Sequence, residues 1–176
     1  MPAQNPPTAW LFLPLSREFD RQDFDCGKPA FNNYLKTIAN QHQKSNIART
    51  TVAVRPSNKN KIAGFYTLNT STVDINSLSA ENQKGLPKHL DIPAIKIGQF
   101  AVDRRYSGQG LGRALILDAL YKCYISSVQV GINSVTVNAY DDEARSFWLH
   151  NEFVPFRERS NSLFLPMKTI QKLFEN

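Results

Sequence analysis

Three glycines at alternate positions mark the stretch of this chain that is best suited to binding an anion. Gly108, Gly110 and Gly112 are separated by single residues. Glycine lets backbone N–H groups approach a ligand without a Cβ in the way. A helix that begins at this point would add unpaired amide donors and a partial positive charge. A diphosphate fits such a site, and flanking arginines would add charge around it, namely Arg104, Arg105 and Arg113.

The spacing of these glycines differs from that of two common phosphate-binding motifs. No Gly-Lys-Ser/Thr follows, so the stretch is not a P-loop, and it lacks the G-x-G-x-x-G order of dinucleotide-binding turns. Residues 105–110 fit the pattern Q/R-x-x-G-x-G/A instead. A tight turn with incidental glycines is the alternative, and the neighbouring strand, helix and arginines disfavour it.

Two flanking elements must position this turn. Ile95–Val102 predicts a strand that leads into it. A helix is expected from Leu111 to about Ser126, with apolar residues around most of its circumference. Such a helix should be buried against a sheet.

The rest of the chain alternates between strand and helix patterns. Thr50–Val54 and Ile62–Thr70 predict a β-hairpin, because both are rich in strand-forming residues and turn residues separate them. A helix is expected from Pro29, with an apolar face that ends at Ile38. The remaining expectations are strands at 10–14, Ser134–Ala139 and Leu163–Pro166, a short helix near Ser79–Lys84, helices starting at Asp141-Asp142 and before Ile170, and interruptions at Leu86-Pro87 and Ile92-Pro93.

Composition and charge narrow the class of protein. The chain has 176 residues, 41% apolar and 20% charged, which predicts one domain over 1–176 with a mixed α/β layer. Its net charge of +6 favours a polyanionic partner such as a nucleotide, CoA or RNA. No apolar window is long enough to span a bilayer, and the N-terminus lacks the basic region and the long apolar run of a signal peptide. We interpret Cys26 and Cys123 as reduced thiols, and therefore expect a cytoplasmic protein without a membrane partner.

Several sequence blocks resemble a known family. Residues 105–110 resemble motif A of the GCN5-related N-acetyltransferases, the GNAT family, whose members bind acetyl-CoA. Blocks between about Leu15 and Pro166 resemble the acetyltransferase toxins of type II toxin–antitoxin systems. These blocks are Phe24-Asp25-Cys26-Gly27, Tyr34-Leu35, Ala48-Arg49-Thr50, Gly64-Phe65-Tyr66-Thr67-Leu68, Leu86-Pro87, Ile92-Pro93-Ala94, Phe100-Ala101-Val102-Asp103-Arg104 and Asp142-Glu143-Ala144.

The resemblance implies a fold, an activity and a set of partners. The implied fold is a central mixed, mostly antiparallel sheet that splays between its fourth and fifth strands, with helices on both faces. The implied activity is transfer of the acetyl group of acetyl-CoA to the α-amine of aminoacyl-tRNA, which blocks translation. The implied partners are aminoacyl-tRNA, a ribbon-helix-helix antitoxin and a second copy in a homodimer. The implied cofactor residues are Phe100, Ala101 and Val102, whose backbone pairs with pantetheine, and Arg105, Gly108, Gln109, Gly110, Leu111, Gly112 and Arg113 around the diphosphate.

This chemistry asks little of an acid–base residue. The pKa of a free α-amine is about 8, and esterification to tRNA lowers this pKa further, so the amine needs little base assistance. A backbone N–H near Val102 can polarise the thioester carbonyl. His42, His89 and His150 do not have the spacing of metal ligands, and no metal is expected.

One position departs from the family pattern. The toxins follow A-x-x-F-Y-x-x-x-G-F, whereas this chain carries Trp148 at the tyrosine position and Glu152 at the glycine position. An indole N–H donates a hydrogen bond but cannot give up a proton near neutral pH. Three possibilities follow: solvent protonates the leaving thiolate, Tyr140 acts as the acid, or the protein binds CoA with weak or no catalysis. Two other functions stay open, a small-molecule or protein N-acetyltransferase and a CoA-binding interaction module.

Overall fold

The structure is a computed structural model that describes residues 10–175. The first nine residues lie outside the described part of the chain. They include most of the N-terminal segment in which the sequence predicts no signal peptide. Among the described helices, none is both long and apolar enough to cross a membrane.

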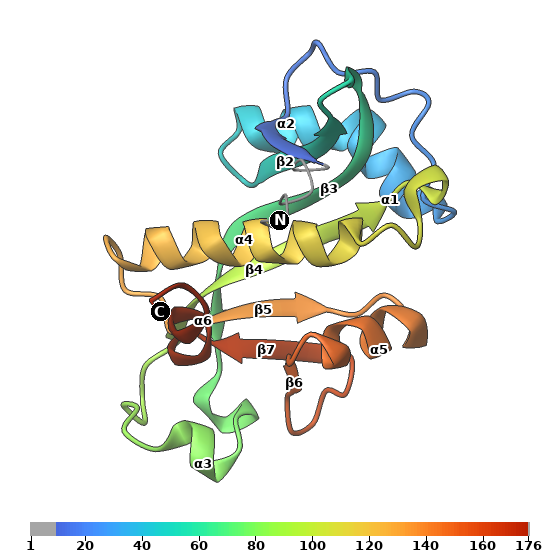
Figure 1. Ribbon diagram of the computed structural model, residues 1–176. Coiled ribbons are helices and arrows are strands. Elements are labelled where there is room, and N and C mark those ends of the chain that lie inside the picture. Colours follow the sequence, from blue (N-terminus) through green and yellow to red (C-terminus); the bar gives the residue numbers. More distant parts are fainter. Residues whose placement is uncertain (1–9, 176) are drawn as a thin grey trace, which may run out of the picture. The chain divides into compact units, whose positions relative to one another are not determined.

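One seven-stranded sheet has the order β1-β2-β3-β4-β5-β7-β6 (Figure 1). β4 and β5 are parallel, whereas β1 pairs antiparallel with β2 and β7 pairs antiparallel with both β5 and β6. The predicted mixed, mostly antiparallel sheet is confirmed. The strands are β1 (Leu11–Pro14), β2 (Arg49–Arg55), β3 (Asn58–Val73), β4 (Ile92–Val102), β5 (Ser134–Asn138), β6 (Val154–Pro155) and β7 (Ser162–Pro166).

The helices follow the predicted positions closely. The expected short helix is present, and so are the helix that follows the glycine turn and the two helices nearest the C-terminus. Their bounds are α1 (Pro29–Asn33), α2 (Ala39–Lys44), α3 (Ala80–Gln83), α4 (Leu111–Ser127), α5 (Asp142–His150) and α6 (Met167–Phe174), with a π-helical turn at Tyr34–Ile38 and 3₁₀ turns at Ile75–Ser77 and Arg104–Tyr106.

Two compact units divide the chain. The first comprises residues 10–67 and Gln99–Asp118, and the second comprises Leu68–Gly98 and residues 119–175. In the first unit, α1 and α2 lie beside β2 and β3 (Figure 1). Its core contains Leu15, Phe24, Tyr34, Leu35, Ala39, Val52, Val54, Ile62, Phe65 and Ala101.

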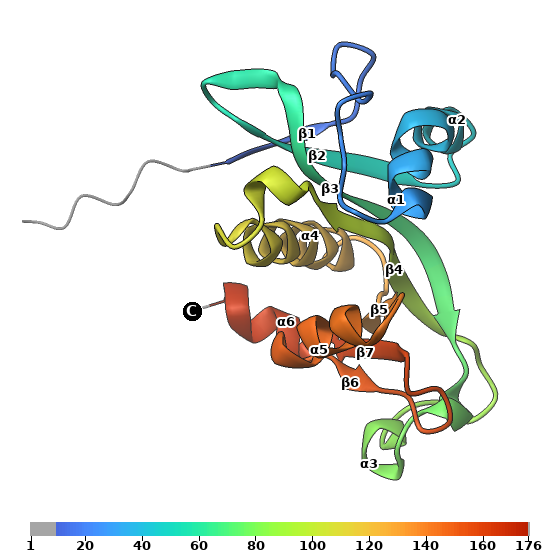
Figure 2. The ribbon, with the colours of Figure 1, turned by 90° about the vertical axis from the view of Figure 1, so that its right-hand side faces the viewer.

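The second unit is built on the strands β5 and β7. Their antiparallel register runs from Ser134–Pro166 to Asn138–Ser162, and Figure 2 shows α5 and α6 on the same side of this pair. A cluster of buried apolar residues forms part of its core, namely Val73, Ile75, Leu78, Ile92, Ala94 and Phe164.

The first helical segment is longer than its sequence pattern indicates. Its apolar spacing ends at Ile38, but the π-helical turn shifts the register and the helix continues to Lys44. Ala39 then becomes fully buried. One inserted residue in a helical turn changes which face points inward, so a simple 3.6-residue pattern cannot reveal the continuation.

Two other expectations differ from the structure. The sequence predicts that α4 is buried against a sheet; Leu111, Leu115 and Ile116 are buried, whereas Leu117, Tyr121 and Ile125 are 39%, 49% and 42% exposed. Ile92-Pro93 does not interrupt regular structure, because β4 begins at Ile92. Proline near the first residue of a strand is tolerated, since little of the ladder then needs its missing N–H.

The two cysteines match the interpretation as structural thiols. Both are free, and Cys123 is fully buried on α4. Burial raises the pKa of the Cys123 thiol to about 12. A buried thiol of this kind is chemically inert.

Candidate functional site

The glycine-rich turn connects β4 to α4 within the first unit. Gly108 and Gly110 have φ values of +73° and +78°, a region that side chains other than glycine rarely adopt. A Cβ built on either residue would meet no atom within 4 Å. The conformation therefore requires glycine, and the space beside both residues is open to a ligand.

The start of α4 supplies amide donors to the same turn. Its amide–carbonyl ladder begins with the bond from the Ala114 N–H to the Gly110 carbonyl oxygen, at 3.2 Å. The amides before Ala114 occupy the first helical turn, where an α-helix has no acceptors for its own N–H groups. An anion at this point satisfies those donors and the helix dipole together.

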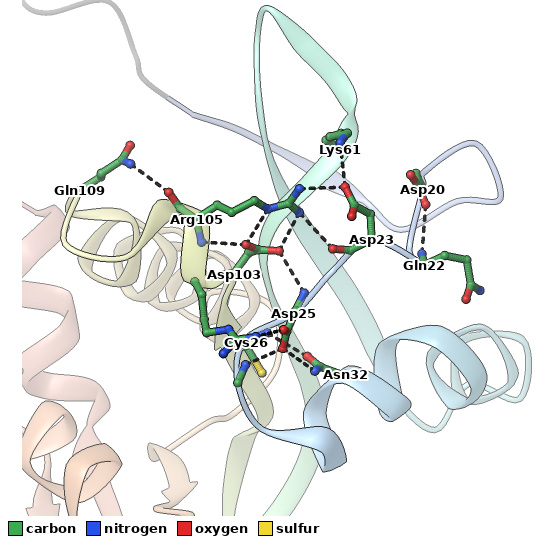
Figure 3. Close-up of polar contacts among 12 residues, drawn as sticks. Asp20, Gln22, Asp23, Asp25, Cys26, Asn32, Lys61, Asp103, Arg105 and Gln109 are labelled. Atoms are coloured by element: carbon green, nitrogen blue, oxygen red, sulfur yellow. Dashed lines mark hydrogen bonds and ion pairs between the residues drawn. The ribbon is translucent and has the colours of Figure 1, made fainter.

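Asp103 is the residue on which the turn is built (Figure 3). Its side chain is 1% exposed, and its own amide donates to the Ala63 carbonyl oxygen at 2.8 Å. The carboxylate accepts hydrogen bonds from the Asp25 amide at 3.0 Å and from Nε and Nη2 of Arg105 at 2.9 and 2.8 Å. Burial alone would raise the pKa of Asp103, but the hydrogen bonds from Arg105 and Asp25 outweigh it and lower the pKa.

Arg105 is paired with carboxylates from two parts of the first unit. Its guanidinium donates to Asp103 and also to the carboxylate and the carbonyl oxygen of Asp23, at 2.8 and 3.1 Å. Lys61 adds a second ion pair to Asp23 at 2.7 Å. Hydrogen bonds from Lys61 and Arg105 lower the pKa of Asp23 to about 2. The positive charge of Arg105 is thus matched by carboxylates, and its side chain braces the turn.

Asp25 fixes the loop that lies beside the turn. Its carboxylate pairs with Arg104 and accepts hydrogen bonds from the Gly27 amide at 2.8 Å and from Asn32 Nδ2 at 2.9 Å. These hydrogen bonds lower the pKa of Asp25 to about 2. We call Asp23, Asp25, Lys61, Asp103, Arg104 and Arg105 the carboxylate network. The sequence analysis did not assign a role to its acidic members, although the block Phe24-Asp25-Cys26-Gly27 was one of those that carried the resemblance.

Gln109 is held between the two glycines by a residue from β2. Its side-chain oxygen accepts a hydrogen bond from Nη2 of Arg55 at 2.5 Å, and its Nε2 donates to the Arg105 carbonyl oxygen at 3.3 Å. The guanidinium of Arg55 lies 4.4 Å from the centroid of the Trp10 ring. Arg55 is a further residue near the turn to which the sequence analysis assigned no role, and no local motif marks it.

The end of β4 lies next to the turn and carries the expected pantetheine residues. The parallel register pairs residues 94–97 with 134–137, and β4 continues for five residues beyond it, to Val102. Ala101 is buried, whereas Phe100 and Val102 are half-buried. A Cβ on Gly64 would come within 3.1 Å of the Ala101 carbonyl oxygen and 2.9 Å of Leu115 Cδ1, so β3 packs closely against both β4 and α4.

The two candidate acid residues belong to the second unit and differ sharply in exposure. Tyr140 is 58% exposed and lies between β5 and α5. Trp148 is 4% exposed, and its ring packs edge-on against Phe147 and Phe153 at centroid distances of 5.3 and 5.0 Å. Trp148 is therefore part of the core.

The helix that carries Trp148 ends in a Schellman motif. The Phe153 amide donates to the Trp148 carbonyl oxygen and the Glu152 amide to that of Leu149, both at 3.1 Å. Glu152 has a φ of +69°, the left-handed conformation that this motif requires. The ring contact between Trp148 and Phe153 is the apolar contact that accompanies such an end.

The histidines do not gather at either place. His42 lies on α2, where its Nδ1 is 3.1 Å from the Tyr34 hydroxyl, and His150 is the last residue of α5. Across residues 10–175, no three histidine, cysteine, aspartate or glutamate residues form a group that could hold a metal ion.

Sequence comparison identifies relatives that match most of the chain, although no family model matches it. The tRNA-acetylating toxin of Mycobacterium tuberculosis (strain ATCC 25618 / H37Rv) is 30% identical over 134 residues, which cover 76% of this chain and 78% of that protein. The probable toxin TacT of Sinorhizobium fredii (strain NBRC 101917 / NGR234) is 31% identical over 161 residues, which cover 88% of each chain.

Solved structures share the fold over nearly their whole length. A tyrosine-to-phenylalanine mutant of KacT matches with a TM-score of 0.89 at 30% identity, covering 94% of this chain and 99% of that chain. AtaT complexed with acetyl-methionyl-tRNAfMet gives 0.87 at 32% identity, with the same coverage of 94% and 99%. A tyrosine-to-phenylalanine mutant of AtaT bound to the C-terminus of the antitoxin AtaR and acetyl-CoA gives 0.82 at 29% identity, covering 96% and 99%.

The fold and the glycine-rich turn first define a class, the GNAT acetyltransferases, as the resemblance predicted. Within that class, identity of 30% or more over most of both chains decides the family. The chain belongs to the tRNA-acetylating toxins of toxin–antitoxin systems.

Proposed function

We propose that this chain is an acetyl-CoA-dependent N-acetyltransferase toxin that acetylates the α-amine of aminoacyl-tRNA and so blocks translation. The observation that carries the proposal is the glycine-rich turn at the start of α4, with both glycines in the left-handed region and open space beside them. The relative AtaT has been solved with acetyl-methionyl-tRNAfMet and, in a mutant form, with acetyl-CoA.

The residues of the turn and of β4 fit coenzyme A. The amides of residues 108–113 hold the diphosphate, helped by the charge of Arg113 and by the N-terminus of α4. The backbone of Phe100, Ala101 and Val102 pairs with pantetheine, and an amide near Val102 polarises the thioester carbonyl. Acetyl-CoA is thus the co-substrate, and Arg105 contributes by bracing the turn through Asp103 and Asp23.

The transfer itself is a single exchange of bonds. The neutral α-amine attacks the thioester carbonyl carbon, a C–N bond forms, the C–S bond breaks, and CoA leaves as a thiolate. The amine loses one proton to water. Since the pKa of such an amine is below about 8, the protein needs no strong base for this step.

Solvent is the proton source for the leaving thiolate in this proposal. Trp148 can donate a hydrogen bond but not a proton, and its ring is packed in the core. Tyr140 is so exposed that its hydroxyl offers little advantage over water. A thiol has a pKa near about 8.5, so its thiolate is already a tolerable leaving group.

The proposed partners follow from the family. AtaT has been solved with the C-terminus of the antitoxin AtaR, and we propose a ribbon-helix-helix antitoxin for this chain. The net charge of +6 suits a tRNA substrate. We also propose that the protein forms a homodimer, that it is cytoplasmic, and that residues 1–176 form one acetyltransferase domain.

The buried Trp148 favours a second candidate function. A protein with tryptophan where the family has tyrosine could bind CoA and the antitoxin yet transfer acetyl groups slowly. Such a protein would be an interaction module retained from an active toxin.

Radiolabelled acetyl-CoA and charged tRNA test these functions. We expect label on the α-amine of the aminoacyl group and none on uncharged tRNA. Label only on small amines or on peptide N-termini would contradict aminoacyl-tRNA as the substrate and favour a small-molecule or protein N-acetyltransferase. CoA binding without any transfer would favour the interaction module.

A further inference from the structure

The positive charges around the glycine-rich turn are not equivalent. Arg104 and Arg105 are paired with carboxylates of Asp25, Asp103 and Asp23. Within residues 10–175, no carboxylate forms an ion pair with Arg55. Two of the three arginines that the sequence placed next to the diphosphate are thus neutralised, and Arg55 from β2 joins Arg113 as an arginine near the turn without a carboxylate partner among the described residues.

Arg55 is held firmly at this position. Its guanidinium lies over the Trp10 ring at 4.4 Å and 5.6 Å from the centroid of Tyr106. Trp10 is only 7% exposed and packs edge-on against Tyr106 at 5.5 Å. The hydrogen bond from Nη2 to Gln109 connects Arg55 to the residue between the two left-handed glycines.

This arrangement has the chemistry of a phosphate ligand. A guanidinium carries five N–H donors in a fixed plane, and Gln109 takes one of them. The remaining donors suit two oxygens of one phosphate, and an arginine that is stacked on aromatic rings loses little further freedom on binding.

We propose that Arg55 binds a phosphate group of coenzyme A, with Gln109 and Trp10 holding the guanidinium in place. The inference rests on the proposed function, because it assigns a residue to the same coenzyme site. The phosphate is either part of the diphosphate or the 3′-phosphate of the adenosine moiety, and the chemistry of recognition is the same for both.

Calorimetric titration of the full chain with CoA and with dephospho-CoA tests the proposal. Arg55→Ala should weaken CoA binding by about 10- to 100-fold, the loss typical of a charge-assisted hydrogen-bond pair. Arg55→Lys, which keeps the charge but loses the planar fork, should lie between Arg55→Ala and the wild type. Arg49→Ala is the matched control: Arg49 is on the same strand and bonded to Asn46 and Gln43, and its loss should leave CoA affinity unchanged.

The two ligands identify which phosphate is bound. If Arg55→Ala weakens CoA and dephospho-CoA equally, the diphosphate is the partner; if it weakens CoA alone, the 3′-phosphate is the partner. Rising salt should weaken CoA binding less in Arg55→Ala than in the wild type, an effect that lost packing alone would not produce.

Unchanged CoA affinity in a folded Arg55→Ala variant, with the wild type binding normally, would overturn this inference and leave the proposed function standing. Failure of the wild-type protein to bind CoA would instead contradict the proposed function. Melting curves show whether Arg55→Ala is folded. If it is not, the CoA affinity of Arg55→Lys tests the inference: weaker binding than in the wild type supports it, and unchanged binding overturns it.

Discussion

The glycine-rich turn of the first unit and the end of α5 in the second unit are built differently. The turn depends on main-chain conformation, with two left-handed glycines braced by a network of charged side chains. The end of α5 depends on one buried ring, Trp148, and on a left-handed glutamate where the family pattern has glycine. The turn keeps the glycines and arginine that resemble motif A, whereas the end of α5 departs from the family pattern at Trp148 and Glu152.

This contrast shows how a main-chain site and a side-chain donor can diverge differently. A main-chain anion site is preserved as long as its glycines and supports remain, whatever side chains surround it. A proton donor depends on one hydroxyl, and a single substitution removes it. Variants at each of the two places test these features separately.

The largest effect is expected from the buried carboxylate of the network. Asp103→Asn keeps the size of the side chain but removes the charge that faces Arg105, and should lower the free energy of unfolding by about 2 kcal/mol. The Arg105 side chain is 43% exposed, so solvent screens part of the loss. CoA affinity should fall as well, because the turn loses its brace.

Asp74 provides the matched control in denaturant titrations. It caps a 3₁₀ turn through the Asn76 amide at 2.9 Å, as Asp103 does through the Arg105 amide, but its side chain is exposed. Asp74→Asn should lower the free energy of unfolding by less than about 1 kcal/mol. Equal losses in the two variants would mean that the network adds nothing beyond a cap.

Close packing at Gly64 should give the next largest effect. Gly64→Ala would place a Cβ 3.1 Å from the Ala101 carbonyl oxygen and 3.2 Å from Leu111 Cδ2, so β3, β4 and the start of α4 must shift. We expect a loss of about 1–2 kcal/mol in the free energy of unfolding. Gly131→Ala, where a Cβ would meet no atom within 4 Å, should be close to neutral, and a similar loss there would exclude crowding as the cause.

At the end of α5, Trp148→Tyr should raise the turnover of acetyl transfer by about tenfold, because it restores a hydroxyl at the position of the family tyrosine. The measurement is single-turnover transfer to aminoacyl-tRNA, with melting curves to follow the packing against Phe153.

Tyr140→Phe should change the rate of the same transfer by less than about twofold. A large loss in Tyr140→Phe would make Tyr140 the acid and would contradict proton donation by solvent.

A smaller gain in stability is expected at Glu152. Glu152→Gly removes the cost of a side chain at a φ of +69° and should raise the free energy of unfolding by about 1 kcal/mol. Asn46, at the same position of the Schellman motif that ends α2, has a φ of +56°. Because asparagine tolerates this conformation, Asn46→Gly should gain less, and an equal gain would remove conformational strain as the explanation.

The smallest expected effect is a pH dependence of stability that arises from the carboxylate network. The pKa values of Asp23 and Asp25 are about 2 in the folded chain against 3.8 ordinarily, so the unfolded chain binds protons first as the pH falls. Their stabilisation is complete above about pH 4 to 5 and is lost as the pH falls towards 2. Melting temperatures between pH 6 and 2 should fall less steeply in Asp23→Asn and Asp25→Asn than in Asp91→Asn, which lies outside the network.

Much of this fold could be predicted because its signals are local. The glycines, the strand that precedes them and the helix that follows occupy consecutive residues, and their types alone indicate an anion-binding turn. The Asp141 cap of α5 is local in the same way, since its carboxylate accepts from the Ala144 amide at 2.8 Å.

The supports of the turn could not be predicted because their partners are distant in sequence. Asp23 and Arg105 are 82 positions apart, and Arg55 and Gln109 are 54 apart. Its position next to the glycines predicts Arg105 near the phosphates, but no local pattern predicts that Asp23 pairs with its guanidinium. The π-helical turn after Asn33 could not be predicted for another reason. One extra residue in a helical turn requires no particular residue type, so the sequence carries no signal for it.

Calorimetry with CoA and with pantetheine, which lacks the diphosphate and the adenosine, tests the central claim most directly. If the turn grips the diphosphate, CoA should bind to the wild-type protein roughly 100-fold more tightly than pantetheine. Equal affinities for the two ligands, or no binding of CoA at all, would contradict the assignment of this turn as the coenzyme site.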